Sequence, residues 1–266
     1  MTETYLHIRN LGVNYGETAA LQDISLDLAT GGRLAVIGES GSGKSTLAMA
    51  IAGLLPKSAQ PEGSIDFPGF PHRPRLGKDI GVLFQDPSGS LDPVTRVGDQ
   101  IAEVIMTHQG SGWISARVRA VELLDRVRIP NALSRLNSYP HEFSGGQKQR
   151  IALAAALAGN PSLLIADEPT SALDTVVQRH IVNLLDELVR ESGLTLLFVT
   201  HDIALASERA DQIAVLYQGR LVETGVATEV LGQPGHPYTK ALIGTHISLD
   251  TPRRKRLAEI DMSQLQ

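Results

Sequence analysis

The chain has 266 residues, of which 42% are hydrophobic, and it carries a formal net charge of −5. It is long enough to bury one large α/β domain with an inserted subdomain, and its acidic balance argues against a protein that mainly wraps nucleic acid. It contains no cysteine, which excludes disulfides, thiolate metal sites and cysteine nucleophiles.

The first part of the chain is predicted to form antiparallel β structure followed by one helix. The stretches that alternate like half-buried strands are residues 5–9, 12–16 and 21–28. A fully apolar strand at 34–37 leads through the glycine-rich residues 38–46 into a helix that ends near Gly53, because Pro56 cannot continue it. Further strands are predicted at 63–67 and 80–84.

From residue 97 to about residue 160 the apolar spacing becomes helical, and Gly110 to Gly112 separate the first two helices. The elements predicted after Pro161 are the strands 163–166, 194–199, 212–216 and 220–222, and the helices 176–190, one from Ile203 and 238–243. We therefore expect an α/β core of residues 1–87 and 161–245, a helical subdomain of residues 88–160 and a tail of residues 246–266.

No apolar run approaches the roughly 18 residues that a membrane-spanning helix needs. The N-terminus, Met1 to Thr4, lacks the basic and apolar regions of a signal peptide. Neither a transmembrane helix nor a signal peptide is predicted, so any association with a membrane is expected to depend on a partner.

Residues 38–46 follow the pattern G-x-x-x-x-G-K-[ST] between a strand and a helix, which is typical of a phosphate-binding P-loop. Glycines let the backbone approach an anion closely, and the N–H groups at a helix start attract negative charge. An ordinary glycine-rich turn is the alternative. Lys44 is expected to bind the β- and γ-phosphates, and Ser45 to bind Mg²⁺. The predicted nucleotide-binding residues of this loop are Gly38, Ser40, Gly41, Ser42, Gly43, Lys44, Ser45 and Thr46.

Two carboxylates, Asp167 and Glu168, directly follow the buried strand 163–166. Ligands of open α/β sheets bind at the carboxyl ends of the strands. We expect Asp167 to hold Mg²⁺, directly or through water, and Glu168 to orient the water that attacks the γ-phosphate. Such a pair is common at strand ends, and the P-loop gives it the catalytic interpretation.

A further helix is predicted from about Gln149 to Leu157. The residues that lead into it, Ser144, Gly145, Gly146 and Gln147, have the composition of a second anion site. The alternative is a turn in which Ser144 only caps the helix. A second phosphate-binding turn makes sense if it closes on a nucleotide that another subunit holds.

Taken together, these motifs resemble those of the nucleotide-binding subunit of ABC transporters. The matching segments are 38–45 as Walker A, 143–147 as the signature, 163–168 as Walker B and 171–174 as the D-loop. Three single residues also match: Gln85 the Q-loop, His201 the switch histidine and Tyr15 the aromatic that stacks on adenine. Outside this pattern, His201 and Tyr15 would be interpreted as structural residues.

The resemblance implies a P-loop NTPase core with an N-terminal antiparallel β subdomain and an inserted all-helical subdomain. It implies that Gln85 touches Mg²⁺ and the attacking water, that His201 contacts the γ-phosphate and Glu168, and that Asp174 contacts the opposing subunit's P-loop. The cofactors would be ATP and Mg²⁺. Two subunits would pair head to tail, with each ATP between the Lys44 region of one and the Ser144 region of the other.

A finer resemblance is to the peptide and nickel importer branch. It rests on the segments 85–93, 97–101, 139–143 and 235–239. Phe143 stands where the signature usually has Leu, which should alter packing only. The chain ends without the cysteine-bearing extension of longer peptide importers, which favours nickel or metallophore members and excludes an iron–sulfur site. The basic run 253–256 is predicted to be a solvated tail, with lipid headgroups or a partner as alternatives.

We therefore expect the ATP-hydrolysing subunit of an ABC importer of oligopeptides or nickel/metallophore, peripheral at the cytoplasmic face of the inner membrane. The implied partners are a second nucleotide-binding subunit, identical or related, the permease subunits, and indirectly an extracytoplasmic substrate-binding protein. No nucleic acid is expected. The alternative is a soluble ABC-type ATPase acting on nucleic acid or ribosomes, which the short insertion of about 70 residues and the single cassette disfavour. An exporter would often carry fused membrane helices, and none are predicted.

Overall fold

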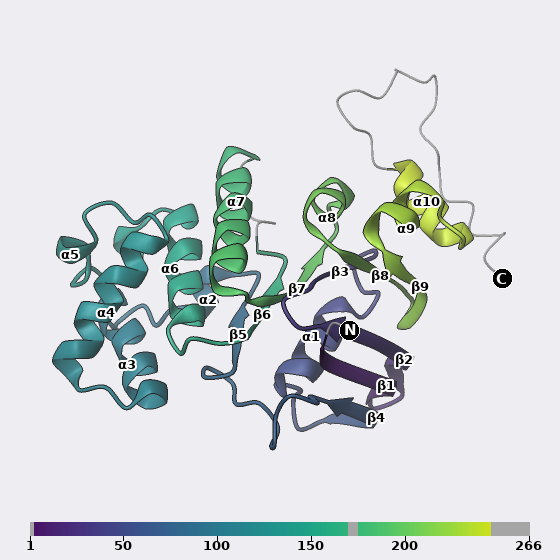
Figure 1. The fold of residues 1–266 in the computed structure, drawn as a ribbon, viewed down its shortest axis with the longest axis horizontal. Coiled ribbons are helices and arrows are strands. Elements are labelled where there is room, and N and C mark those ends of the chain that lie inside the picture. The colour runs from purple at the N-terminus through teal and green to yellow at the C-terminus, as the bar shows by residue number, and fades with distance from the viewer. Residues whose placement is uncertain (1–2, 170–174, 246–266) are drawn as a thin grey trace. The chain divides into compact units, whose positions relative to one another are not determined.

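A computed structural model describes residues 3–169 and 175–245 (Figure 1). Within them the chain forms two compact units, one of residues 3–69 with 197–245 and one of residues 70–169 with 175–196. The D-loop segment 171–174, with Asp174, and the tail 246–266, with its basic run, lie outside the described residues.

The first unit contains a three-stranded antiparallel sheet in the order β2-β1-β4 (Figure 1). Its strands are β1 (Thr4–Tyr15), β2 (Thr18–Ala29) and β4 (Ala59–Asp66). The prediction of two short strands within residues 5–16 was wrong, because β1 runs through Asn10 without interruption. The strand is nevertheless irregular at Asn10, which takes a left-handed φ of 49°, and Gly63 on β4 lies opposite this irregularity. A Cβ on Gly63 would lie 2.3 Å from Asn10 O, so glycine is required there.

The other strands of the first unit bring the chain to the glycine-rich loop. Parallel to β3 (Arg33–Ile37) lies β8 (Gln212–Tyr217), which pairs antiparallel with β9 (Arg220–Val226). The continuous apolar sequence of β3 follows from its burial from Leu34 to Ile37. The helices of this unit are α1 (Lys44–Ala52), α8 (Ile203–Arg209), α9 (Ala227–Gly232) and α10 (Pro237–Thr245).

The second unit combines two parallel strands with most of the helices. β5 (Ile80–Leu83) pairs with β6 (Leu163–Asp167). Phe84, which we expected within this strand, lies beyond its end and is 40% exposed. The helices are α2 (Pro87–Ser90), α3 (Val97–Gln109), α4 (Trp113–Arg126), α5 (Ala132–Arg135), the 3-10 turn at Pro140–Glu142, α6 (Gly145–Leu157) and α7 (Thr175–Ser192). β7 (Thr195–Thr200) carries the chain from this unit back into the first.

Helix periodicity predicted the buried face of α7 correctly, since Ile181, Leu184, Leu185 and Leu188 are all buried. Among the described residues, no helix is both long and apolar enough to span a bilayer. The predicted boundaries of the α/β core and the helical subdomain stay a prediction.

Candidate nucleotide-binding site

The glycine-rich loop between β3 and α1 has the backbone geometry of an anion cradle. Gly38 and Gly43 take φ values of 152° and 104°, and Gly43 precedes the first residue of the helix. A Cβ would lie 2.2 Å from Leu216 O at Gly38, and 2.7 Å from Ala20 O at Gly43. The loop therefore packs so closely on its neighbours that side chains are excluded at both positions.

Lys44 lies at the first turn of α1 and is only 5% exposed. Its Nζ donates hydrogen bonds to Gly38 O at 2.9 Å and Glu39 O at 2.7 Å. These bonds fix the ammonium in the loop, at a helix start whose N–H groups favour a bound anion. The Ser42 hydroxyl is buried and has no hydrogen-bond partner among the described residues. A phosphate oxygen would satisfy both groups, so the loop fits the triphosphate of a nucleotide.

The end of β6 carries the two predicted carboxylates. Asp167 is the last residue of the strand, and Glu168 follows it with a φ of 44°. A left-handed conformation is uncommon for a residue with a Cβ and is tolerated most often at functional sites. Both side chains are half-buried, which reduces but does not remove their contact with water.

Gln85 and Glu168 are 83 residues apart in the sequence and are hydrogen-bonded in the structure. Gln85 Nε2 donates to Glu168 Oε2 at 3.2 Å. The parallel pairing of β5 with β6 brings this about, because Leu83 lies opposite Ala166 and the two strands end together. The predicted Q-loop glutamine and the predicted catalytic carboxylate therefore share one site.

The signature residues form the start of α6. Ser144 caps the helix, since its Oγ accepts the Gln147 N–H at 3.4 Å and its own N–H donates to Gln147 Oε1 at 3.0 Å. Ser144 and Gly145 are exposed, while Phe143 is buried and lies under the Arg135 guanidinium at 5.2 Å. Phe143 is therefore packed in the interior, while the start of the helix is exposed.

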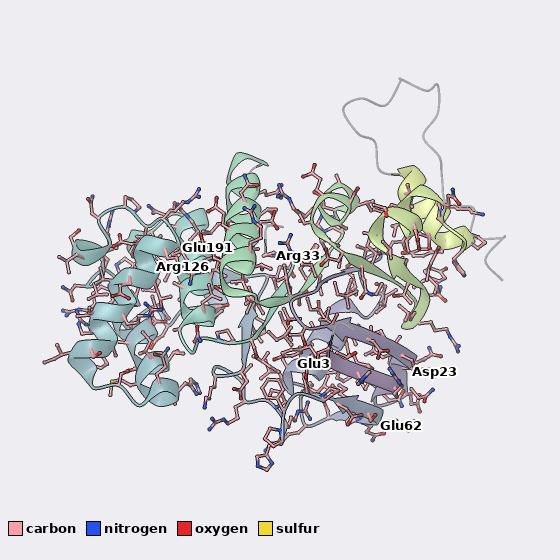
Figure 2. The ribbon with its side chains drawn as sticks, viewed as in Figure 1. Glu3, Asp23, Arg33, Glu62, Arg126 and Glu191 are labelled. Carbon is pink, nitrogen blue, oxygen red and sulfur yellow. The ribbon has the colours of Figure 1, made fainter. Side chains whose placement is uncertain are left out.

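A hydrogen bond and two ion pairs that we did not predict tie α6 and α7 to the end of α4. Arg150 of the signature helix donates to Arg128 O at 2.7 Å. Burial, followed by the positive charge of Arg128, lowers the pKa of Arg150. Arg128 in turn contacts Glu187 at 2.6 Å, and Arg126 contacts Glu191 at 3.1 Å, as Figure 2 shows for the latter pair. The sequence did contain a signal for these contacts, because Glu187 and Glu191 are four residues apart and so lie on one face of α7.

Two of the single predicted residues lie at the ends of strands in the first unit. Tyr15 is half-buried at the end of β1, opposite Thr18 and Ala59. His201 is exposed and directly follows β7. Next to it, Asp202 caps α8 by accepting the Leu205 N–H at 3.1 Å, which fixes the backbone where His201 leaves the strand.

Within the described residues, no group of three or more His, Asp and Glu side chains is arranged to hold a metal ion by itself. Mg²⁺ does not need such a group, because nucleotide enzymes usually bind it with one or two carboxylates, phosphates and water. The exposed hydroxyl of Ser45 and the carboxylate of Asp167 are donors of the right chemistry.

The family model described as ABC transporter matches residues 21–171, more than half of the chain. The chain belongs to the ABC transporter family. Among its relatives, the oligopeptide transport ATP-binding protein OppD of Bacillus subtilis is 41% identical over 96% of this chain and 75% of that protein. The dipeptide transport ATP-binding protein DppD of Lactococcus lactis is 40% identical over 94% of this chain and 75% of that protein.

Solved structures of ABC cassettes share the fold. The ABC transporter component cbiO1 of Clostridium perfringens has a TM-score of 0.74 and 32% identity, covering 87% of this chain and 92% of its own. The ATP-binding cassette MJ0796, in a dimeric post-hydrolysis state with ADP and Pi, has a TM-score of 0.72 and 30% identity, covering 84% and 98%. The predicted fold class, a P-loop NTPase core with β and helical subdomains, is confirmed.

Proposed function

We propose that this ABC protein is the ATP-binding and ATP-hydrolysing subunit of an importer of oligopeptides or dipeptides. The observation that carries the chemistry is the bond between Gln85 and Glu168 in a chain that also holds Lys44 within a P-loop. The transported class is supported by the names of the relatives OppD and DppD, which match nearly the whole chain. The peptide branch is therefore preferred to the nickel or metallophore branch.

In this proposal the P-loop residues, from Gly38 to Thr46, bind the phosphates through backbone N–H groups and Lys44, and Tyr15 stacks on the adenine. Ser45, Gln85 and Asp167 would hold Mg²⁺, whose charge would offset that of the phosphates. Glu168 accepts a hydrogen bond from the attacking water and orients it, and His201 contacts the γ-phosphate. The amide of Gln85, hydrogen-bonded to Glu168, keeps that carboxylate in place.

Hydrolysis in this proposal needs a second nucleotide-binding subunit, and the dimeric state of the cassette MJ0796 supports this. Ser144 to Gln147 would close on the partner's ATP, and Asp174 would contact the partner's P-loop. The exposed, capped start of α6 offers N–H groups to such an anion. The pair would work at the cytoplasmic face of the inner membrane, bound to permease subunits. An extracytoplasmic binding protein would deliver the substrate to these permease subunits.

Purification of the membrane complex through a tag on this chain tests the assignment. We expect permease subunits and a second ATPase subunit, either another copy or a related chain, to accompany it. The complex should bind labelled oligopeptide at its extracytoplasmic side when the binding protein is present. Recovery with ribosomes or nucleic acid would instead support a soluble ABC ATPase, and uptake of labelled nickel without peptide would overturn the substrate class.

Two substitutions of Ser144 test whether this residue only caps the helix or also binds a phosphate. Ser144→Ala removes the cap acceptor and should lower stability by about 1 kcal/mol. Ser144→Asp keeps an acceptor for the Gln147 N–H and should leave the melting temperature near that of the wild type. It places a negative charge where the partner's γ-phosphate should bind, so we expect ATP turnover to fall by about a hundredfold or more. If turnover instead follows stability, with Ala worse than Asp, Ser144 is a cap only.

A further inference from the structure

Tyr238 connects the end of the described chain to the P-loop. It lies in the first turn of α10, is fully buried, and its hydroxyl oxygen accepts the backbone N–H of Glu39 at 3.0 Å. Glu39 is the second residue of the P-loop, 199 positions earlier. The sequence marked residues 235–239 only as a feature of a subfamily and as the start of a helix, and gave them no role in nucleotide binding.

The residue that Tyr238 contacts, Glu39, also binds Lys44 through its backbone carbonyl. Glu39 O accepts Lys44 Nζ at 2.7 Å and the Ser42 N–H at 3.2 Å. The N–H of Glu39 is bonded to Tyr238, so both backbone polar groups of one residue are fixed. Any rotation of Glu39 about its backbone would therefore move an acceptor of the ammonium that is to meet the phosphates.

Tyr238 itself is held firmly. Its ring packs on Tyr217, at the end of β8, with the ring centres 4.2 Å apart, and its N–H donates to His236 Nδ1 at 3.1 Å. Burial raises the pKa of the Tyr238 phenol, so the hydroxyl stays protonated at neutral pH. A charged phenolate beside the P-loop is thereby avoided.

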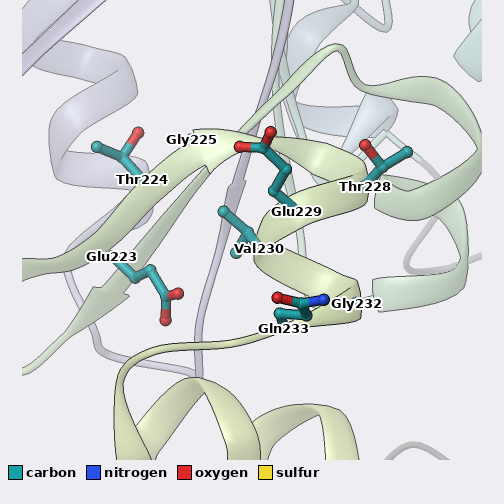
Figure 3. A pocket seen from close by; sticks show the side chains of 8 residues that line it. All are labelled: Glu223, Thr224, Gly225, Thr228, Glu229, Val230, Gly232 and Gln233. Atoms are coloured by element: carbon teal, nitrogen blue, oxygen red, sulfur yellow. The ribbon is translucent and has the colours of Figure 1, made fainter.

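Glu223 on β9 anchors the chain just before α10. Its carboxylate accepts the N–H groups of Gly235 at 2.7 Å and His236 at 3.0 Å. Figure 3 shows Glu223 in the wall of a pocket between β9 and α9, its carboxylate directed toward the chain that leads into α10. Burial alone would raise the pKa of this carboxyl, but the hydrogen bonds it accepts hold the pKa below its ordinary value. The anchor therefore stays ionised.

We propose that Tyr238 is a positioning residue for nucleotide binding, which fixes Glu39 and through it the place of Lys44. Glu223 supports it by holding the segment 235–237 from which α10 starts. The inference rests on the proposed function in one respect, since it takes MgATP as the ligand of the P-loop. It adds that the segment 235–239 controls the affinity of this loop for the nucleotide.

Tyr238→Phe tests the hydroxyl alone, because phenylalanine keeps the ring against Tyr217. We expect the full chain to bind MgATP about fivefold to tenfold more weakly, since a partly buried N–H loses its partner. The kcat at saturating MgATP should change by less than about twofold, because Lys44 reaches its place once the nucleotide is bound. The matched control is Tyr217→Phe, which removes the hydroxyl from the other ring of the pair, where it accepts from Gln218 Nε2.

Calorimetric titration with MgATP and steady-state kinetics give the dissociation constant, KM and kcat of each variant. The control should bind MgATP like the wild type, and Glu223→Gln should weaken binding in the same direction as Tyr238→Phe but by less. Equal affinity of the wild type and Tyr238→Phe would overturn the inference, and so would equal weakening by both tyrosine variants. If the wild-type chain bound no MgATP, the proposed function itself would be contradicted. Failure of the proposed function is therefore distinguishable from failure of the inference about Tyr238.

Discussion

Replacing Glu168 by Gln is expected to lower the ATP turnover of the assembled transporter by about a hundredfold to ten-thousandfold. The amide has nearly the shape of the carboxylate, so the left-handed backbone at φ 44° and the neighbouring Gln85 are undisturbed. What it lacks is the negative charge that draws a proton from the attacking water. ATP binding should survive, because the P-loop is untouched.

An ATP-bound pair of subunits should therefore accumulate in the Glu168→Gln variant. Size-exclusion chromatography with and without MgATP detects the pair, and phosphate release measures turnover. Glu62→Gln is the matched control, because Glu62 is an exposed carboxylate on β4 and its loss should leave turnover unchanged. Turnover in Glu168→Gln equal to that of the wild type would remove Glu168 from its assigned role.

Replacing Lys44 by Ala is expected to weaken MgATP binding by about a hundredfold or more. In the complex with ATP, the Lys44 ammonium and a phosphate would form a buried charge pair. Loss of one member of such a pair costs about 3–5 kcal/mol, and 1.4 kcal/mol corresponds to tenfold in affinity. Lys44 is 5% exposed, and the two carbonyls that it contacts, of Gly38 and Glu39, would lose a donor as well. Both effects act on the same loop, so turnover should be lost together with binding.

Lys57→Ala provides the control for Lys44→Ala, because Lys57 is exposed in the turn between α1 and β4. Titration with MgATP compares the two variants with the wild type, and the melting temperature without nucleotide reports whether each variant is folded. A folded Lys44→Ala chain with wild-type affinity would show that the P-loop lysine does not contact the phosphates.

Local sequence patterns predicted those parts of the site whose functional side chains lie close in the sequence to the turn or strand end that positions them. The P-loop is one example, because the glycines at 38 and 43 are fixed by close contacts with Leu216 and Ala20. The Walker B pair is another, since the burial of residues 163–166 dictates an apolar run that leads directly to Asp167. The helix of the signature was predicted, but its start was placed near Gln149, whereas α6 begins at Gly145 because Ser144 and Gln147 form a capping box.

Contacts between distant segments were beyond this kind of reasoning. The bond from Glu39 to Tyr238 joins residues 199 positions apart, and nothing near Glu39 indicates a tyrosine partner. The pairs of Arg126 and Arg128 with α7 are of the same kind. The continuity of β1 was missed for another reason: Asn10 adopts a left-handed φ that the alternation of apolar residues does not reveal, and a glycine on β4 compensates.

Short helices escaped prediction because they contain too few residues to show a period. α2, α5 and α9 have four, four and six residues. Of these, α9 matters most for function, because it lies on the path from β9 to α10 and so precedes the segment that places Tyr238.

The most direct test of the proposed function is peptide transport by the purified complex in proteoliposomes. Labelled oligopeptide, its binding protein and MgATP are supplied, and peptide accumulation and phosphate release are measured together for the wild type and Glu168→Gln. We expect the wild-type complex to accumulate peptide and release phosphate, and the variant to bind MgATP but do neither. Peptide accumulation by both complexes alike, or none by a wild-type complex that hydrolyses ATP, would contradict the proposed function.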